Sequence, residues 1–172
     1  MPLALTLSYV VHVVSAALWT GGVLYAAYAV FPPARGGDLS PPAFERSVDG
    51  LLQVTRWTGI ALPVTGAYQI WVLYPTDRLL GTTAGHLVVG MALLWSVMNG
   101  VVELGVYRMR TLDGEALGVG RYMAEGFALD GDADLSDVVD AAGTGRPYVL
   151  AAAGLAVLLL VDAGLLAAGV PL

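Results

Sequence analysis

Cysteine and lysine are both absent from this chain of 172 residues, and only two histidines occur. Without cysteine there is no disulfide framework, no thiolate metal site and no redox thiol. All eight basic residues are arginine, against 14 acidic residues, so the net charge is −6. We interpret this acidic, lysine-free composition as adaptation to concentrated salt, as in halophilic archaea, and we expect no nucleic-acid partner.

Charge of either sign is also scarce, because 13% of the residues are charged and 57% are hydrophobic. A soluble domain carries about 25% charged residues. The charged residues are clustered, and four long stretches between the clusters carry almost none. Each of these stretches holds the roughly 20 apolar residues that a helix needs to cross a bilayer. The sequence therefore predicts an all-α fold, an integral membrane four-helix up-down bundle in contact with lipid. It forms a single domain over 1–172, with helices at about 3–31, 55–75, 80–108 and 147–169.

The arginines predict the orientation of this bundle. Seven of the eight fall in the two longer connections or at the helix ends beside them, and only Arg78 falls in the short turn between the second and third helices. Because basic loops stay in the cytoplasm, we expect both termini outside the cell membrane and the acidic loop 110–146 inside. Ser40 and two prolines precede apolar residues at helical spacing from Phe44 onward, which predicts an interfacial helix ahead of the second span.

Both histidines lie inside predicted membrane helices, His12 in the first and His86 in the third. An ionisable side chain at such a depth needs a partner and is a functional candidate by default. In the first helix, Ser8, His12, Ser15 and Trp19 follow one another at spacings of four, three and four, which places them on one stripe. We expect this stripe to face the interior of the protein.

Each of the other three predicted helices carries a polar residue at a similar depth to this stripe. At a rise of 1.5 Å per residue, His12, Gln69, His86 and Asp162 all fall in the outer half of the membrane. Helices one and three stand on a diagonal of roughly 14 Å, which suits two imidazoles on opposite faces of one haem. We therefore expect haem b between His12 and His86, serving electron transfer or haem handling. The hydrogen-bond partners expected for the imidazoles are Ser8, Ser15, Gln69 and Asp162.

Two other functions remain open from the residues alone. A copper site is one, although Cu(I) favours sulfur ligands and the chain has only five methionines, of which Met91 and Met98 are explained as paired core residues. A non-catalytic membrane partner subunit with structural histidines is the other. A redox partner, another membrane subunit and a second copy are all compatible with the sequence. If the protein is an enzyme, it is a membrane oxidoreductase.

A charged pair is expected at the inner ends of two helices. Glu103 lies near the end of the third predicted helix, and Arg56 lies at the corresponding end of the second. Pairing would neutralise both side chains inside a hydrophobic protein. We predict a structural clamp here.

Two short motifs carry a family resemblance. His12, six further residues and Trp-Thr-Gly-Gly at 19–22 resemble the first helix of CopD-type copper-resistance membrane proteins. Arg-Trp-Thr-Gly at 56–59 and Thr-Gly at 65–66 are similar to the second helix of that family. The histidine–tryptophan spacing is also similar to that of HemJ-like protoporphyrinogen oxidases, which resemble haem-binding four-helix proteins. The resemblance covers about 1–110 and implies a shared scaffold with a site centred on His12.

Overall fold

The computed structural model describes residues 2–112, 114, 118–129 and 131–169, and within these ranges it contains helices and no strands, which confirms the all-α prediction. A π-helical turn, η1, continues the first helix into α2. The elements are α1 (Leu3–Tyr25), η1 (Ala26–Val30), α2 (Phe31–Gly36), α3 (Pro41–Leu73), α4 (Thr76–Gly81), α5 (Thr83–Arg110), α6 (Val119–Glu125) and α7 (Leu135–Ala168).

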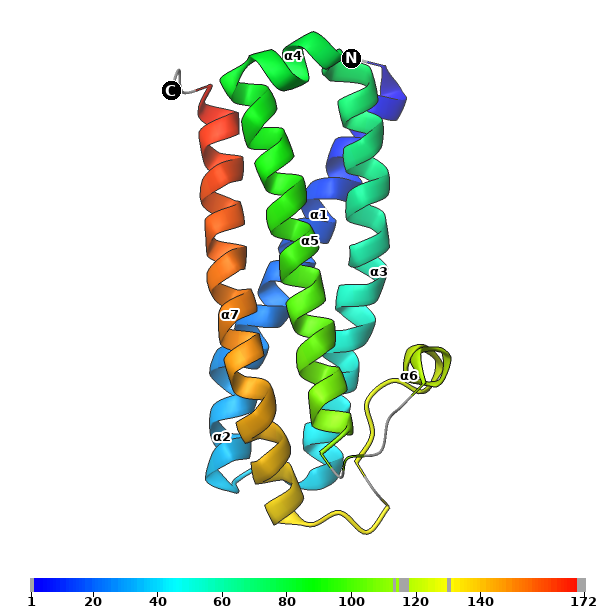
Figure 1. Ribbon diagram of the computed structural model, residues 1–172, viewed down its shortest axis with the longest axis vertical. Coiled ribbons are helices and arrows are strands. Elements are labelled where there is room, and N and C mark those ends of the chain that lie inside the picture. The colour runs from blue at the N-terminus through cyan, green and yellow to red at the C-terminus, as the bar shows by residue number, and fades with distance from the viewer. Residues whose placement is uncertain (1, 113, 115–117, 130, 170–172) are drawn as a thin grey trace.

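The four long helices lie along the long axis of the molecule (Figure 1). The first turn of α1, the last turn of α7 and α4 lie at one end, here called the α4 end, whereas α2 and α6 lie at the other, the α6 end. The most extensive contacts join α5 to α7 and α1 to α3, while α3 and α5 touch much less. The sheet-free fold thus consists of two closely packed helix pairs.

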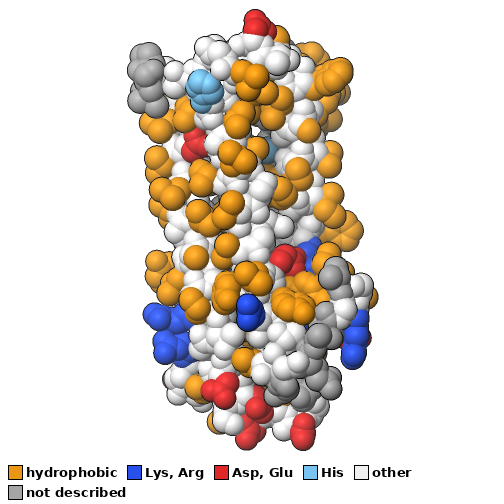
Figure 2. Space-filling model, in the orientation of Figure 1, with side chains coloured by type: hydrophobic (Ala, Val, Ile, Leu, Met, Phe, Trp, Pro, Cys, Tyr) orange, Lys and Arg blue, Asp and Glu red, His pale blue; other side chains and the backbone are white. Residues whose placement is uncertain are grey.

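Three stretches are long and apolar enough to cross a membrane: Leu3–Gly36, Thr83–Arg110 and Leu135–Ala168. In Figure 2 apolar side chains gather over the α4 end and the middle of the visible face, and the basic groups lie below them, toward the α6 end. Helix α3, which contains the predicted span 55–75, does not reach the same apolar composition. The structure therefore supports three of the four predicted spans by length and composition.

Helix α3 begins earlier than the sequence suggested. Ser40 has an extended backbone and precedes prolines at the first helical positions, which is a favourable helix start. From there the helix runs unbroken to Leu73, so the prediction of a separate interfacial helix was wrong. Phe44 explains why: its ring is fully buried and packs edge-on against Phe31 at 5.8 Å and Phe127 at 5.7 Å. The apolar spacing reflects packing against protein.

Helix α7 also begins earlier, at Leu135 and not near residue 147. Asp134 caps it, because its carboxylate accepts hydrogen bonds from the backbone N–H groups of Ser136 at 2.6 Å and Asp137 at 3.3 Å. The Asp137 carboxylate accepts in return from the N–H of Asp134 at 2.7 Å, which completes a capping box. Pro147 is accommodated inside the helix. The predicted loop 110–146 is therefore shorter, and it contains α6.

Glycines allow α5 and α7 to approach closely at the α6 end. A Cβ atom added to Gly105 would lie 2.6 Å from Cβ of Tyr148, and one added to Gly145 would meet Met109 and Phe31. Any larger residue would push these helices apart, as in other tightly packed membrane helices. This half of the molecule is therefore densely packed, and its largest fully buried side chains include Phe31, Phe44, Leu52, Val102 and Val138.

Candidate functional site

A cavity of about 350 Å³ lies among α1, α3, α5 and α7 on the α4 side of the dense core. Its lower limit is a contact between α3 and α5, where a Cβ on Gly59 would lie 3.2 Å from Oδ1 of Asn99. Beyond this contact the two helices diverge, and Leu73 and Tyr74 line the far end of the space. The wall is largely apolar, and its residues with polar or sulfur atoms include His12, Trp19, Gln69, Met91 and Trp95.

His12 is held in this wall by Thr65. Its Nδ1 lies 2.8 Å from the Thr65 hydroxyl oxygen, which itself donates to the carbonyl of Ala61 at 2.6 Å. A hydroxyl has one hydrogen, and two carbonyls of the same helix can accept it, those of Ala61 and of Leu62 at 3.1 Å, so we assign the oxygen as the acceptor from His12. In the neutral imidazole the proton is therefore on Nδ1, and Nε2 carries the free lone pair. This tautomer is assigned from the hydrogen-bond network.

Further polar contacts fix the two helices that carry this pair. The Ser8 hydroxyl donates to the backbone carbonyl of Thr65 at 3.2 Å and accepts from Nε2 of Gln69 at 3.2 Å. Gly66 leaves space for the imidazole, because a Cβ there would lie 3.4 Å from Cε1 of His12. Helices α1 and α3 are thus joined at His12 and one turn before it, and the ring lies between a hydrogen-bond partner and Gly66.

Two indole groups in the wall have unsatisfied donors. Trp19 is fully buried, and neither its Nε1–H nor that of Trp95 has a hydrogen-bond partner among the described residues. Both side chains line the cavity. Buried donors are nearly always paired in folded proteins. Two donors beside the cavity therefore remain without a partner in surroundings that are otherwise hydrophobic.

Two residues of the predicted site lie outside the cavity wall. Ser15 and Asp162 are both buried, but neither lines the cavity. The Asp162 carboxylate faces α5, since a Cβ on Gly90 would lie 3.7 Å from its Oδ2, and neither oxygen has a partner in the described part of the chain. Asp162 and Ser15 do not bond to His12, whose recorded side-chain partner is Thr65.

His86 is not in the cavity wall either. It lies in the first turn of α5, is exposed, and its Nε2 lies 2.9 Å from the carbonyl oxygen of Leu80. Three residues of the predicted set therefore line the cavity: His12, Trp19 and Gln69. Ser8 is bonded to Gln69 and to the carbonyl of Thr65 next to this wall. Sequence reasoning missed Thr65 as the hydrogen-bond partner of His12, and Met91 and Trp95 as residues of the cavity wall. The Thr-Gly pair at 65–66 was visible as a motif, although its role as the imidazole acceptor was not.

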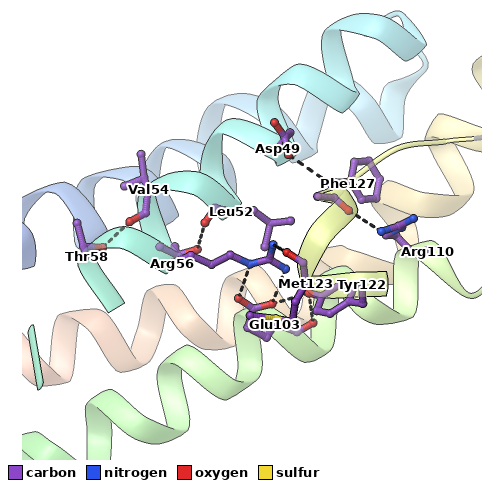
Figure 3. Close-up of polar contacts among 12 residues, drawn as sticks. Asp49, Leu52, Val54, Arg56, Thr58, Glu103, Arg110, Tyr122, Met123 and Phe127 are labelled. Carbon is purple, nitrogen blue, oxygen red and sulfur yellow. Dashed lines mark hydrogen bonds and ion pairs between the residues drawn. The ribbon is translucent and has the colours of Figure 1, made fainter. Parts of the chain in front are cut away.

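A second polar cluster lies toward the α6 end (Figure 3). Arg56 and Glu103 form the predicted ion pair, which is confirmed, with Nε to Oε1 at 3.1 Å and Nη2 to Oε2 at 3.3 Å. The Tyr122 hydroxyl donates to the Glu103 carboxylate at 2.5 Å, and burial together with this bond raises the pKa of Tyr122. Arg56 also donates to the carbonyl of Met123 at 3.2 Å. The clamp therefore joins α3, α5 and α6.

The chain after α6 is anchored by further contacts to the long helices. Arg110 donates to the carbonyl of Gly126 at 2.6 Å, and the N–H of Phe127 donates to Asp49 at 3.4 Å (Figure 3). The N–H of Leu129 donates to Glu45 at 2.7 Å. An open hollow of about 500 Å³ lies beside this cluster, but its acid and its base already neutralise each other. We assign this region a structural role.

No group of three or more His, Asp or Glu side chains is placed to hold a metal ion in the part of the chain that the structure describes. The copper interpretation therefore gains no support from the geometry. A single axial histidine, as in many haem proteins, does not require such a group.

Comparison with known proteins adds no assignment. No family model, no curated protein and no solved structure matches the chain.

Proposed function

We propose that the chain is an integral membrane protein in which α3 is the fourth span of an up-down bundle. The support comes from the exposed face of α3, where large apolar side chains recur at helical spacing. Trp57 is 76% exposed and Trp71 is 87% exposed. The polar side chains of the same helix, Thr65 and Gln69, face α1 instead. A helix with its apolar stripe outward and its polar stripe inward suits lipid surroundings.

The proposed orientation follows the basic residues. Seven of the eight arginines lie at or toward the α6 end, and Arg78 lies at the α4 end. The α6 end would therefore lie on the cytoplasmic side of the cell membrane. Both termini would then be outside. The site around His12 would lie in the outer half of the membrane, where the apolar wall meets lipid and not water.

We propose further that His12 would hold the iron of haem b in the cavity, and that the protein is a small membrane cytochrome for electron transfer or haem handling. The observation that carries this proposal is the hydrogen bond from His12 Nδ1–H to Thr65, which leaves the Nε2 lone pair free. Histidines that bind metals commonly donate their second ring N–H to an acceptor that fixes the tautomer.

The other residues of the wall suit such a group. A haem is flat and mostly apolar, and aromatic, aliphatic and thioether side chains surround the space next to His12. Met91 lies in the same wall, so we propose its thioether as the second ligand, with His86 as the alternative. When bound, the haem supplies one-electron chemistry, while the chain holds the iron and sets the polarity around it.

An optical titration of the purified protein with haem tests the proposal. We expect a Soret band that saturates at one haem per chain, and its loss in His12→Ala. His86→Ala should keep the band if Met91 is the second ligand, because the His86 ring lies outside the cavity. Stoichiometric copper binding without a Soret band would favour the CopD-like alternative. Binding of neither would leave a non-catalytic partner subunit, and both of these results would overturn the haem proposal.

A further inference from the structure

An arginine lies at the rim of the cavity at the α4 end. Leu73 and Tyr74 line the space where α3 ends. Arg78, from α4, reaches back to this rim: its Nη1 donates to the carbonyl of Leu73 at 3.2 Å, and its guanidinium carbon lies 5.0 Å from the centre of the Tyr74 ring. Two contacts with lining residues thus hold the guanidinium at this end of the cavity.

Few other charged side chains lie near the Arg78 guanidinium in the described part of the chain. The other seven arginines belong to α2, to α6, or to the parts of α3, α5 and α7 nearer the α6 end. Asp77 is the neighbouring acid on α4, and His86 is exposed at the start of α5. In the described part of the chain Arg78 has no ion-pair partner, and the Leu73 carbonyl is its only recorded acceptor. Most of its five N–H donors are therefore available.

We infer that Arg78 binds the carboxylates of the cofactor held by His12, so that the carboxylate edge lies at the rim and the apolar edge lies deeper. This inference rests on the proposed haem function. Arginine binds carboxylates through two parallel charge-assisted hydrogen bonds, which are the strong ones. Leaving the carboxylates at the aqueous rim avoids burying two negative charges in a hydrophobic cavity. The cofactor is thus an amphiphile with one orientation.

The test compares haem with haem dimethyl ester, whose carboxylates are neutralised, in titrations of the wild-type apoprotein and of Arg78→Gln. We expect wild type to bind haem about tenfold more tightly than the ester, and Arg78→Gln to lose most of this preference. Affinity for the ester should stay unchanged, since it does not need the guanidinium. Arg78→Lys, which keeps the charge, should restore part of the preference, and Asp77→Asn should preserve or increase it.

The outcomes separate the two proposals. If neither compound gives a Soret band with wild type, the haem function fails. If both bind but Arg78→Gln weakens them equally, Arg78 acts only through the end of α3, and the inference is overturned. The inference is also overturned if Arg78→Gln keeps the full preference for haem, because the carboxylates must then lie elsewhere.

Discussion

The hydroxyl oxygen of Thr65 lies 2.8 Å from Nδ1 of His12 and 2.6 Å from the carbonyl oxygen of Ala61, so it accepts from the first and donates to the second. Thr65 follows Pro63, whose missing N–H leaves α3 with a freed backbone carbonyl one turn earlier. The imidazole is therefore oriented by a hydroxyl that is itself fixed by its own helix. These two bonds assign the proton of the neutral imidazole to Nδ1 and leave Nε2 with its lone pair.

Replacement of Thr65 with valine removes the acceptor while keeping the shape of the side chain. Because an acceptor on the second ring nitrogen fixes the ligand, we expect haem affinity to fall by about 10–100-fold in Thr65→Val. Thr58→Val is the matched control, since the Thr58 hydroxyl donates to Val54 within the same helix. Equal Soret titrations for the two variants would mean that Thr65 does not position His12.

The second axial ligand is decided by a pair of variants. With Met91 as ligand, Met91→Leu should convert a low-spin spectrum to a high-spin one with little loss of haem, because leucine fills the same space without a donor atom. His86→Ala should then leave the spectrum unchanged. The reverse pattern would restore the predicted pair of histidines, and it would require His86 to leave the Leu80 carbonyl. Absorption and electron paramagnetic resonance spectra of both variants distinguish these results.

The sequence predicted the helical class and the buried stripe of α1 well, because both depend on local periodicity. Ser8, Ser15 and Trp19 are buried as the spacing required. The Arg56–Glu103 pair was also predictable, since two opposite charges in apolar helices at similar depth have few other partners.

Other features depend on contacts between distant segments, which periodicity does not reveal. The rotation of α5 about its axis decides that Met91 and Trp95 face the cavity while His86 does not. Likewise, the start of α3 looked interfacial because an apolar face that packs on Phe127, far along the chain, has the same pattern as one that packs on lipid. The early start of α7 was hidden because its first turns carry acidic residues that resemble a loop.

Removal of the Glu103 charge should destabilise the clamp at the α6 end. In Glu103→Gln the half-buried Arg56 loses its partner, so we expect the free energy of unfolding to fall by about 1–3 kcal/mol. Tyr122→Phe removes one hydrogen bond and should cost less. Unfolding of the purified protein in detergent measures both, with the exposed Asp132→Asn as a control without effect. If Arg56→Gln and Glu103→Gln had additive effects in the double variant, the two side chains would not be coupled.

The attachment of α6 should weaken in acid. Hydrogen bonds from Arg121 and Arg110 lower the pKa of Glu125 below its ordinary value of 4.5. A depressed pKa in the folded state means that the contribution is complete above the unfolded value and is lost as the pH falls through the folded value. The rate of amide hydrogen exchange in α6, corrected for intrinsic rates, should therefore rise as the pH is lowered from about 6 to about 3.5. Glu125→Gln should exchange faster at the higher pH and change less; an equal change in both proteins would exclude Glu125 as the cause.

Single cysteines in this cysteine-free chain test the proposed topology and the fourth span together. Ser40 and Asp77 flank α3, whereas Asp77 and Asp132 flank α5, and all three side chains are exposed. With a reagent that does not cross membranes, we expect Asp77→Cys to react on intact cells, and Ser40→Cys and Asp132→Cys to react only after permeabilisation. The opposite pattern would invert the orientation. Reaction of Ser40→Cys and Asp77→Cys from the same side would show that α3 does not cross the bilayer, and its exposed tryptophans would then need another explanation.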